Sequence, residues 1–348
     1  MNDQPSVTQV QNSAGPWQLA WRRLRQDRMA MWSLAVTSLF IAIMLASYAG
    51  LIARNWNAEV ANSYAEPTFN KVTNTTDAKA PVGIPRPEAG PPVDISDIDP
   101  LAPRYQEWRE RAAKIAAVQA EQATRLPFGA DKWGHDVLAK TIKGSEVSIT
   151  VGVVAALLAV LIGTTLGAWA GYFGGLADTV LEWLYNVLTS LPYILLILAV
   201  AAVFSRGFTT IILILGLTGW TGIYRLVRAE YLKHTERAYV RAAQALGASH
   251  ASRMFKHILP NVSHVVLVQF SQNVVGFIKA EVILSFLGLG VSVDMVSWGT
   301  ILAETQEELV IGKWWQLVAA GGSMAILVTA ISLLTDAMRD ALDPKLHE

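Results

Sequence analysis

The sequence predicts an all-α membrane protein with six transmembrane helices. Of its 348 residues, 52% are hydrophobic and only 16% are charged, whereas soluble domains carry about a quarter charged residues. Six apolar runs have the length that crosses a bilayer, which is about 20 residues in a helix. They lie at about 29–52, 148–171, 179–204, 209–227, 261–287 and 315–335.

The composition argues against several other kinds of protein. The formal net charge is zero, so no basic field favours a nucleic-acid partner. The chain has no cysteine, which excludes disulfides, thiolate metal sites and a cysteine nucleophile. Its six histidines contain no His-x-x-x-His pair. We therefore expect no catalytic residue, no metal and no cofactor on this chain, and membrane lipid around it.

The N-terminal part consists of a polar segment and a first span. Residues 1–28 are polar and hold four arginines, and the following run, 29–52, has 24 residues without a charge. This run is longer than the apolar region of a signal peptide, although Ala46-Ser47-Tyr48-Ala49 resembles a cleavage site. We expect an uncleaved first transmembrane helix, with a removed signal peptide as the alternative.

A long hydrophilic insert, 53–147, follows the first span. Seven of the 14 prolines lie between Pro81 and Pro103, so this part should be extended. An apolar stripe at helical spacing then predicts an amphipathic helix; it consists of Leu101, Tyr105, Trp108, Ala112, Ile115 and Gln119. The stripe could pack on the membrane core of the same chain or contact a soluble partner outside the membrane.

The membrane core, 148–335, carries two features that bear on helix packing. Gly163, Gly167 and Gly171 recur at intervals of four residues in the second span, which lets another helix backbone approach closely. We expect plain helix packing there, within the subunit or across a dimer interface. Pro192 lacks an amide donor and should kink the third span, as a hinge or as a fixed bend.

One face of the fifth span is polar or small. Polar groups that face lipid without a partner cost several kcal/mol each, so this face should meet water or another helix. Two alternatives remain: a solvated translocation path and buried hydrogen bonds between helices. Glu281 could be a gate, a cap of an adjoining helix or a structural group. The candidate path residues are Gln269, Gln272, Asn273, Gly276, Lys279 and Glu281.

Lysine and arginine in the short connections predict the orientation. Residues 1–28 hold four of them, 225–260 hold seven and 336–348 hold two, whereas the other short connections hold only Arg206 and Lys313. Positive residues concentrate on the cytoplasmic side, and long loops cross the membrane largely regardless of charge. Both termini, including the tail 336–348, and the 225–260 connection should be cytoplasmic, with the insert 53–147 outside the cell membrane.

The cytoplasmic connection between the fourth and fifth spans contains an unusual segment, 239–260. It is basic and helix-forming, Gly247 interrupts it, and Ile258-Leu259-Pro260 should stop its second helix. Such a shaped element serves no purpose for the span itself. We interpret it as a docking loop for another protein.

The chain lacks machinery for driving transport by itself. No G-x-x-x-x-G-K-[ST] phosphate loop occurs, so ATP cannot bind in that way. No charged relay threads several spans, as a proton-coupled carrier would need. An energy source on another subunit is therefore expected.

Four motifs of the chain are specific when they are taken together. The docking loop, with Arg241-Ala242-Ala243-x-x-x-Gly247 and His257-Ile258-Leu259-Pro260-Asn261, is similar to the EAA loop of ABC-importer permeases. The other motifs are Phe128-Gly129-Ala130-Asp131-x-x-Gly134-His135-Asp136-Val137-Leu138, Leu284 to Gly290 with Ser297-Trp298-Gly299, and Arg339-Asp340-Ala341-Leu342-Asp343-Pro344. Together they resemble the C-type permease subunit of the dipeptide/oligopeptide/nickel ABC importer family, and the resemblance covers about 17–55 and 126–347. Arg241 stands where the family has a glutamate, and His135 where it often has arginine.

The resemblance implies a type I ABC importer permease in a bacterial inner membrane. The expected partners are a second homologous permease (a heterodimer), two ATPase subunits that bind ATP and Mg, and an extracytoplasmic binding protein that delivers a solute, most simply short peptides. The loop would sit in a groove of the ATPase and couple its closure to alternating access. The implied coupling residues are Tyr239, Arg241, Ala242, Ala243, Leu246, Gly247, Ala248, Arg253, Lys256, His257, Leu259 and Pro260, with Arg241, Arg253 and Lys256 at the rim.

Other functions remain open at this point. Within the family, the solute could be nickel or another small molecule. From other classes, the chain could be a stand-alone secondary carrier, a channel or a scaffold without transport activity.

Overall fold

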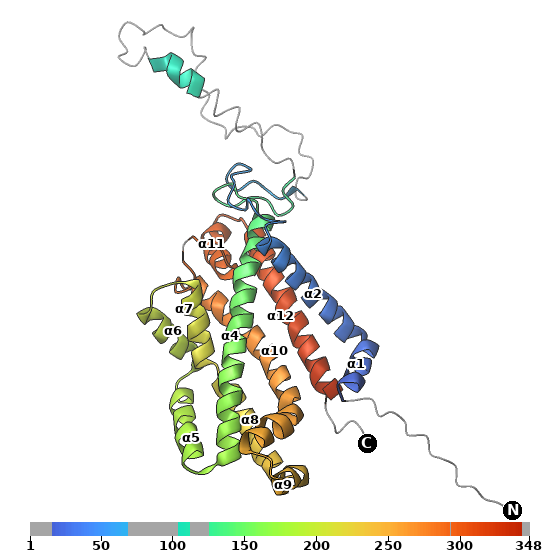
Figure 1. Ribbon diagram of the computed structural model, residues 1–348. Coiled ribbons are helices and arrows are strands. Elements are labelled where there is room, and N and C mark those ends of the chain that lie inside the picture. The colour runs from blue at the N-terminus through green and yellow to red at the C-terminus, as the bar shows by residue number, and fades with distance from the viewer. Residues whose placement is uncertain (1–15, 69–103, 112–124, 293, 343–348) are drawn as a thin grey trace, which may run out of the picture.

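The computed structural model describes residues 16–68, 104–111, 125–292 and 294–342 (Figure 1). Within these ranges all named elements are helices, and the only strand-like contacts are two isolated β-bridges, which confirms the predicted all-α class. The named helices are α1 (Pro16–Gln26), α2 (Arg28–Tyr48), α4 (Val137–Phe173), α5 (Gly175–Thr189), α6 (Tyr193–Val203), α7 (Phe208–Thr218), α8 (Thr221–Thr235), α9 (Ala238–Ala245), the π-helix η3 (Ser252–Ile258), α10 (Leu259–Phe286), α11 (Trp298–Val310) and α12 (Trp315–Leu342).

The membrane-spanning helices agree with the sequence in number. Five helical stretches of the described chain are long and apolar enough to cross a membrane, and the bent pair α5–α6 makes up to six. The two helices of that pair meet at 85°. The bend lies at Pro192, which caps α6 and cannot donate a hydrogen bond. The predicted break at this proline is therefore confirmed.

Helix α4 is the central element of the bundle (Figure 1). It packs against α7 and α8 on one side, against α10 on another, and against α2 and α12. The largest apolar cluster of buried side chains lies among these helices. We call the end that carries α9 the coupling end, and the opposite end, where the polar insert leaves α2 and returns to α4, the insert end (Figure 1).

The three spaced glycines of α4 pack against α8. A Cβ atom at Gly163, Gly167 or Gly171 would lie 2.6–2.7 Å from the backbone oxygen of a residue in or just before α8, far inside normal contact. These oxygens belong to Trp220, Tyr224 and Arg228. The prediction of plain helix packing is confirmed, and the packing is within the subunit.

Helix α4 begins earlier than the sequence suggested. It starts at Val137, capped by Asp136, rather than at about 148. The charged residues Lys140, Lys143 and Glu146 made this stretch look like a loop, but each of them has an oppositely charged partner. The helix therefore extends beyond the apolar run into the insert end.

The two ends of the insert pair with each other. The backbone amides of Val60 and Ala61 donate to the oxygen of Gly134, and the amide of Ala130 donates to the oxygen of Ala65. Gly134 has a φ of 80°, and a Cβ there would lie 2.1 Å from the Ala61 oxygen. Only glycine fits, so this glycine helps to close the base of the insert.

The amphipathic helix predicted for the insert is described only in part. Residues 105–111 are helical, and the side chains of Tyr105 and Trp108 are 37% and 41% exposed. The whole proline-rich stretch, 81–103, and the members of the stripe at 101, 112, 115 and 119 lie outside the described residues. Whether the stripe contacts a soluble partner stays a prediction.

Pro260 does not stop a helix, and that prediction is wrong. Residues 252–258 form a π-helix that continues directly into α10, so that 252–286 is one helical stretch. In the π-helix the Leu259 amide donates to the Met254 oxygen, five residues back. The wider turn directly precedes Pro260 and accommodates the proline within the continuous helix.

Candidate functional site

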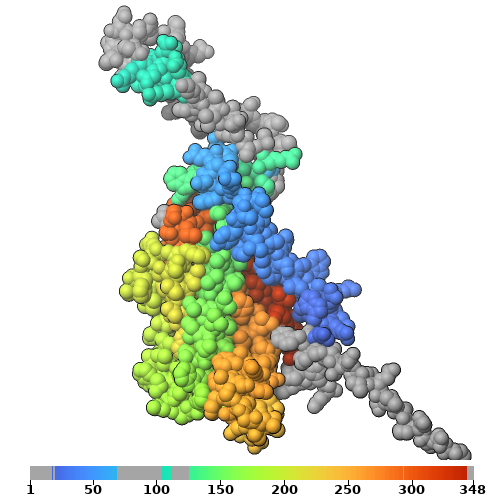
Figure 2. Space-filling view, viewed as in Figure 1, coloured from blue at the N-terminus to red at the C-terminus, as the bar shows by residue number. Residues whose placement is uncertain are grey.

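The segment 239–260, which we call the coupling element, projects from the coupling end of the bundle (Figure 2). It consists of most of α9, a turn at Gly247 and a second helix that includes η3. One face of the element is packed: Val240, Met254 and Ile258 are buried in a cluster with α4 and α8. The element is thus a fixed protrusion of the bundle.

The opposite face of the coupling element is open. Arg241 and Ala242 are exposed, and Leu246 at the tip is 88% exposed. Gly247 has a φ of 81°, which side-chain-bearing residues rarely adopt, and a Cβ there would meet nothing within 4 Å. An apolar residue on a glycine turn in open space is a suitable tip for insertion into another protein.

Two residues of the coupling element lie elsewhere than expected. Ala243 is buried, because it follows Val240 by three residues and shares its face. Arg253, expected at the rim, is only 8% exposed. Its guanidinium lies 5.6 Å above the ring of Tyr172 and 3.1 Å from Nδ1 of His250. Both residues support the element from inside.

The remaining predicted coupling residues lie on the accessible side or near it. Tyr239, Lys256 and Pro260 are exposed, whereas Ala248, His257 and Leu259 are half-buried. The ring of Phe255 is 49% exposed, and the sequence analysis did not single it out.

Two polar contacts hold the coupling element against the bundle. The Tyr231 hydroxyl of α8 donates to the Met254 oxygen of η3 at 3.0 Å. The Tyr172 hydroxyl at the end of α4 lies 3.0 Å from Nδ1 of His250. The sequence did not reveal the pair of Tyr172 and His250, because the two residues lie 78 positions apart in the chain.

Helix α10 keeps an open polar face. Gln272 and Lys279 are exposed, and a Cβ at Gly276 would meet nothing within 4 Å. Gln269 is half-buried and donates to the side-chain oxygen of Asn273 at 3.3 Å. Towards the coupling end, Gln269 and Gln272 line a cavity of about 400 Å³ together with His264 and Arg339. This face is poorly covered within the single chain.

Glu281 is not on that face. It is fully buried and accepts hydrogen bonds from Ser148 and Ser285, both at 2.7 Å. The Ser148 hydroxyl in turn accepts from the amide of Trp298, the first residue of α11. The geometry supports the structural alternative for Glu281, which helps to fix the start of an adjoining helix.

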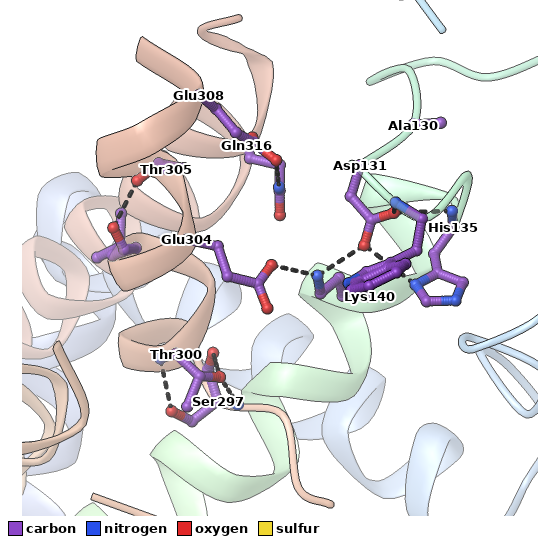
Figure 3. Close-up of polar contacts among 12 residues, drawn as sticks. Ala130, Asp131, His135, Lys140, Ser297, Thr300, Glu304, Thr305, Glu308 and Gln316 are labelled. Atoms are coloured by element: carbon purple, nitrogen blue, oxygen red, sulfur yellow. Dashed lines mark hydrogen bonds and ion pairs between the residues drawn. The ribbon is translucent and has the colours of Figure 1, made fainter. Parts of the chain in front are cut away.

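A charged cluster lies at the insert end (Figure 3). The ammonium of Lys140 is 2.7 Å from Asp131 and 2.5 Å from Glu304, so it joins the base of the insert to α11. Burial alone would raise the pKa of Asp131, but the charge and hydrogen bond of Lys140 and the amide of His135 outweigh it. The pKa of Asp131 therefore lies below its usual value.

A second acid of α11, Glu308, has its pKa shifted in the opposite direction. Glu308 is 1% exposed and accepts from Nε2 of Gln316 at 2.6 Å (Figure 3). The other oxygens of this pair, Oε2 of Glu308 and Oε1 of Gln316, have no partner in the described part of the chain. Burial raises the pKa of Glu308, and a protonated carboxyl brings the donor that the pair lacks.

These features define a class of protein: a multi-pass, all-helical membrane subunit with a packed protrusion at one end and a polar face on a central helix. The family model for the binding-protein-dependent transport system inner membrane component matches residues 163–348. The model for the N-terminal transmembrane domain of oligopeptide transport permease C matches residues 15–67. The chain belongs to the binding-protein-dependent permease family, and it is a transport component of the inner membrane.

Curated relatives agree with this assignment. The dipeptide transport system permease protein DppC of Bacillus subtilis (strain 168) is 38% identical over 63% of this chain and 69% of the relative. DppC of Lactococcus lactis subsp. cremoris (strain MG1363) is 29% identical over 95% of this chain and 91% of the relative. The glutathione transport system permease protein GsiD of Pectobacterium atrosepticum is 36% identical over 63% of this chain and 72% of the relative. The chain is thus a permease subunit of an ATP-driven importer.

Proposed function

We propose that this permease imports short peptides. The relatives are named for dipeptides, for oligopeptides and for glutathione, itself a peptide. The described residues also offer a polar helix face with amide side chains, which suits a solute rich in amide groups. Nickel import, the alternative within the family, has no such feature in its favour.

The observation that carries the mechanism is the coupling element. Its inner face is packed on α4 and α8, and its tip presents Leu246 in open space beside the Gly247 turn. A packed base transmits force to the bundle, and an exposed apolar tip enters a groove. We propose that this groove belongs to an ATPase subunit, which binds ATP and Mg and drives alternating access.

The proposed orientation places the coupling end in the cytoplasm. The coupling element, the basic helix α1 and the end of α12 lie at this end, whereas the base of the insert lies at the other (Figure 1). The basic residues of the short connections concentrate at the coupling end, as the positive-inside rule requires. The insert then faces an extracytoplasmic binding protein.

We further propose that the open face of α10 lines the translocation path. Gln272 and Lys279 are exposed within a membrane-spanning helix, and such groups cannot face lipid cheaply. A second permease opposite this face would enclose a wet path between the two subunits. Gln269 and Gly276 belong to the same face.

Replacing Gly247 by tryptophan tests the docking role. The bulky ring would point into open space and the strain of the positive φ is confined to an exposed turn, so the bundle should form, while insertion into a groove becomes impossible. We expect normal membrane levels, loss of ATPase copurification and loss of peptide uptake. Deletion of 242–248 should do the same.

Gly312→Trp is the matched control, because Gly312 has a φ of 78° and nothing within 4 Å of a Cβ, but lies at the insert end. This variant should still copurify with the ATPase subunits. Normal uptake by Gly247→Trp would refute the docking role.

A further inference from the structure

A pocket of about 370 Å³ opens at the insert end, beside the charged cluster of Figure 3. Its walls come from the base of the insert, the α6–α7 turn, the α10–α11 connection and α11. Trp56 and Trp133 contribute aromatic surface, and Arg206, Thr300 and Glu304 contribute polar groups. Its size falls in the range of about 300–1,000 Å³ that is typical of small-molecule sites.

The lining holds a carboxylate, Glu304, and a guanidinium, Arg206, whose charges are not fully compensated by neighbouring residues that the structure describes. Lys140 is shared between Asp131 and Glu304, so these three groups together carry a net charge of −1, and Nδ1 of His135 also lies 3.0 Å from Asp131. Oε2 of Glu304 contacts Lys140, whereas Oε1 has no hydrogen-bond partner in the described residues and the side chain is 29% exposed. Arg206 is exposed and forms no ion pair with any residue that the structure describes.

Arg206 is also unusual in its location. It lies in the short α6–α7 connection, and Lys313 is the only other lysine or arginine in a short connection at this end. The topology of the membrane protein does not call for a cation here. The side chain instead lies at the pocket, next to Gly288, where the backbone leaves room.

We infer that this pocket is an entry site for a small zwitterionic solute, with Arg206 binding its carboxylate and Oε1 of Glu304 binding its ammonium group. A guanidinium suits a carboxylate because it offers parallel donors. The aromatic walls of Trp56 and Trp133 accept apolar side chains without selecting among them. The inference rests on the proposed peptide function, since a free short peptide carries both charges.

The test measures peptide binding to the purified permease–ATPase complex. The binding protein is left out, so that any preference among peptides comes from the complex itself. The ligands are alanyl-alanine, its C-terminal amide and its N-acetyl derivative, compared by titration calorimetry. We expect the wild-type complex to prefer the free dipeptide by about ten-fold or more over each blocked form, as for a lost charge-assisted hydrogen bond. Arg206→Gln should bind the free dipeptide and its C-terminal amide equally well, but should still prefer the free dipeptide over the N-acetyl derivative. Glu304→Gln should bind the free dipeptide and the N-acetyl derivative equally well, but should still prefer the free dipeptide over the amide.

Arg54→Gln is the matched control, because Arg54 is an exposed arginine near the same end that does not line the pocket. It should keep both preferences. Arg206 forms no ion pair with any described residue, so its variant should fold normally and decides the matter even if Glu304→Gln does not assemble. Equal affinity of the wild-type complex for all three ligands would overturn the inference, as would an unchanged preference in Arg206→Gln.

Uptake by the complete system separates the two proposals. If alanyl-alanine is imported but the complex shows no charge preference, the entry site is wrong and the peptide function stands. If the wild-type system imports no di-, tri- or oligopeptide, the proposed substrate class itself is wrong.

Discussion

The spaced glycines of α4 have a structural role that can be measured at single residues. A Cβ at Gly167 would lie 2.7 Å from the Tyr224 oxygen and 3.1 Å from the Arg228 nitrogen. Both are backbone atoms of α8, which cannot move aside as a flexible side chain could. The helices would have to separate.

Gly167→Ala should therefore lower the free energy of unfolding by about 1–3 kcal/mol, the usual cost of overpacking. The measurement is thermal unfolding of the purified protein in detergent. Gly276→Ala is the control, since nothing lies within 4 Å of its Cβ. An unchanged midpoint for Gly167→Ala would contradict the close contact, and a charge at Gly167 should disturb assembly rather than substrate choice.

Asp131 makes stability depend on pH in the acid range. Its pKa is lower in the folded protein than in the unfolded chain, because Lys140 and the His135 amide outweigh the opposing effect of burial. Its stabilising contribution is therefore present above the unfolded pKa of about 3.9 and is lost as the pH falls through the folded value.

Asp131→Asn should cost about 2 kcal/mol at neutral pH, the scale of a hydrogen bond to a charged group. The difference from wild type should shrink below about pH 4. Unfolding midpoints between pH 7 and pH 3 measure this. A difference that stays constant over the range would show that the carboxylate charge of Asp131 is not responsible.

At the scale of elements, the attachment of the coupling element matters most. Helix α8 holds η3 through the Tyr231 hydroxyl and the Met254 oxygen. The Met254 oxygen also accepts the Leu259 amide of the wide turn. The link therefore acts where the helix departs from regular α-geometry, next to Pro260.

Tyr231→Phe should loosen this attachment by about 1 kcal/mol, the net worth of one hydrogen bond. We expect faster amide exchange in 239–258, with α4 and α12 unchanged, and weaker coupling of ATP hydrolysis to uptake. Tyr185→Phe is the control, because no hydrogen bond of the Tyr185 hydroxyl is present in the described chain. Equal exchange in both variants would argue against this attachment.

The elements also show which features a sequence reveals. Apolar length predicted the spans, and Pro192 predicted the break between α5 and α6, because both depend on local chemistry. The start of α4 and the continuous helix through Pro260 were missed. They depend on distant partners: Lys140 pairs with Glu304 of α11 as well as with Asp131, and the π-turn is held by Tyr231 of α8.

The same distinction applies to the candidate site. Motifs predicted the coupling element, and residue spacing predicted a polar face on α10. They misplaced Ala243 and Arg253, because the face that each residue presents depends on how α9 and η3 lie against α8 and against Tyr172 of α4. They also missed Tyr172, His250 and the Lys140–Glu304 pair, for which sequence spacing offers no signal.

At the scale of the molecule, the two ends of the bundle differ in character. The coupling end presents a packed protrusion with an apolar tip. The insert end presents a closed base, a charged cluster and a polar pocket. Helix α4, Val137–Phe173, runs between them and contacts most other helices, so it can carry movement from one end to the other.

The most direct measurement uses the absence of cysteine from the chain. Leu246→Cys at the coupling end and Val310→Cys at the insert end each introduce a single thiol at a side chain that is 88% exposed. A short thiol-reactive crosslinker is added to the assembled complex in membranes. We predict that Leu246→Cys is joined to an ATPase subunit and that Val310→Cys is not. An ATPase adduct at Val310→Cys, or none at Leu246→Cys in a complex that contains the ATPase, would contradict the account.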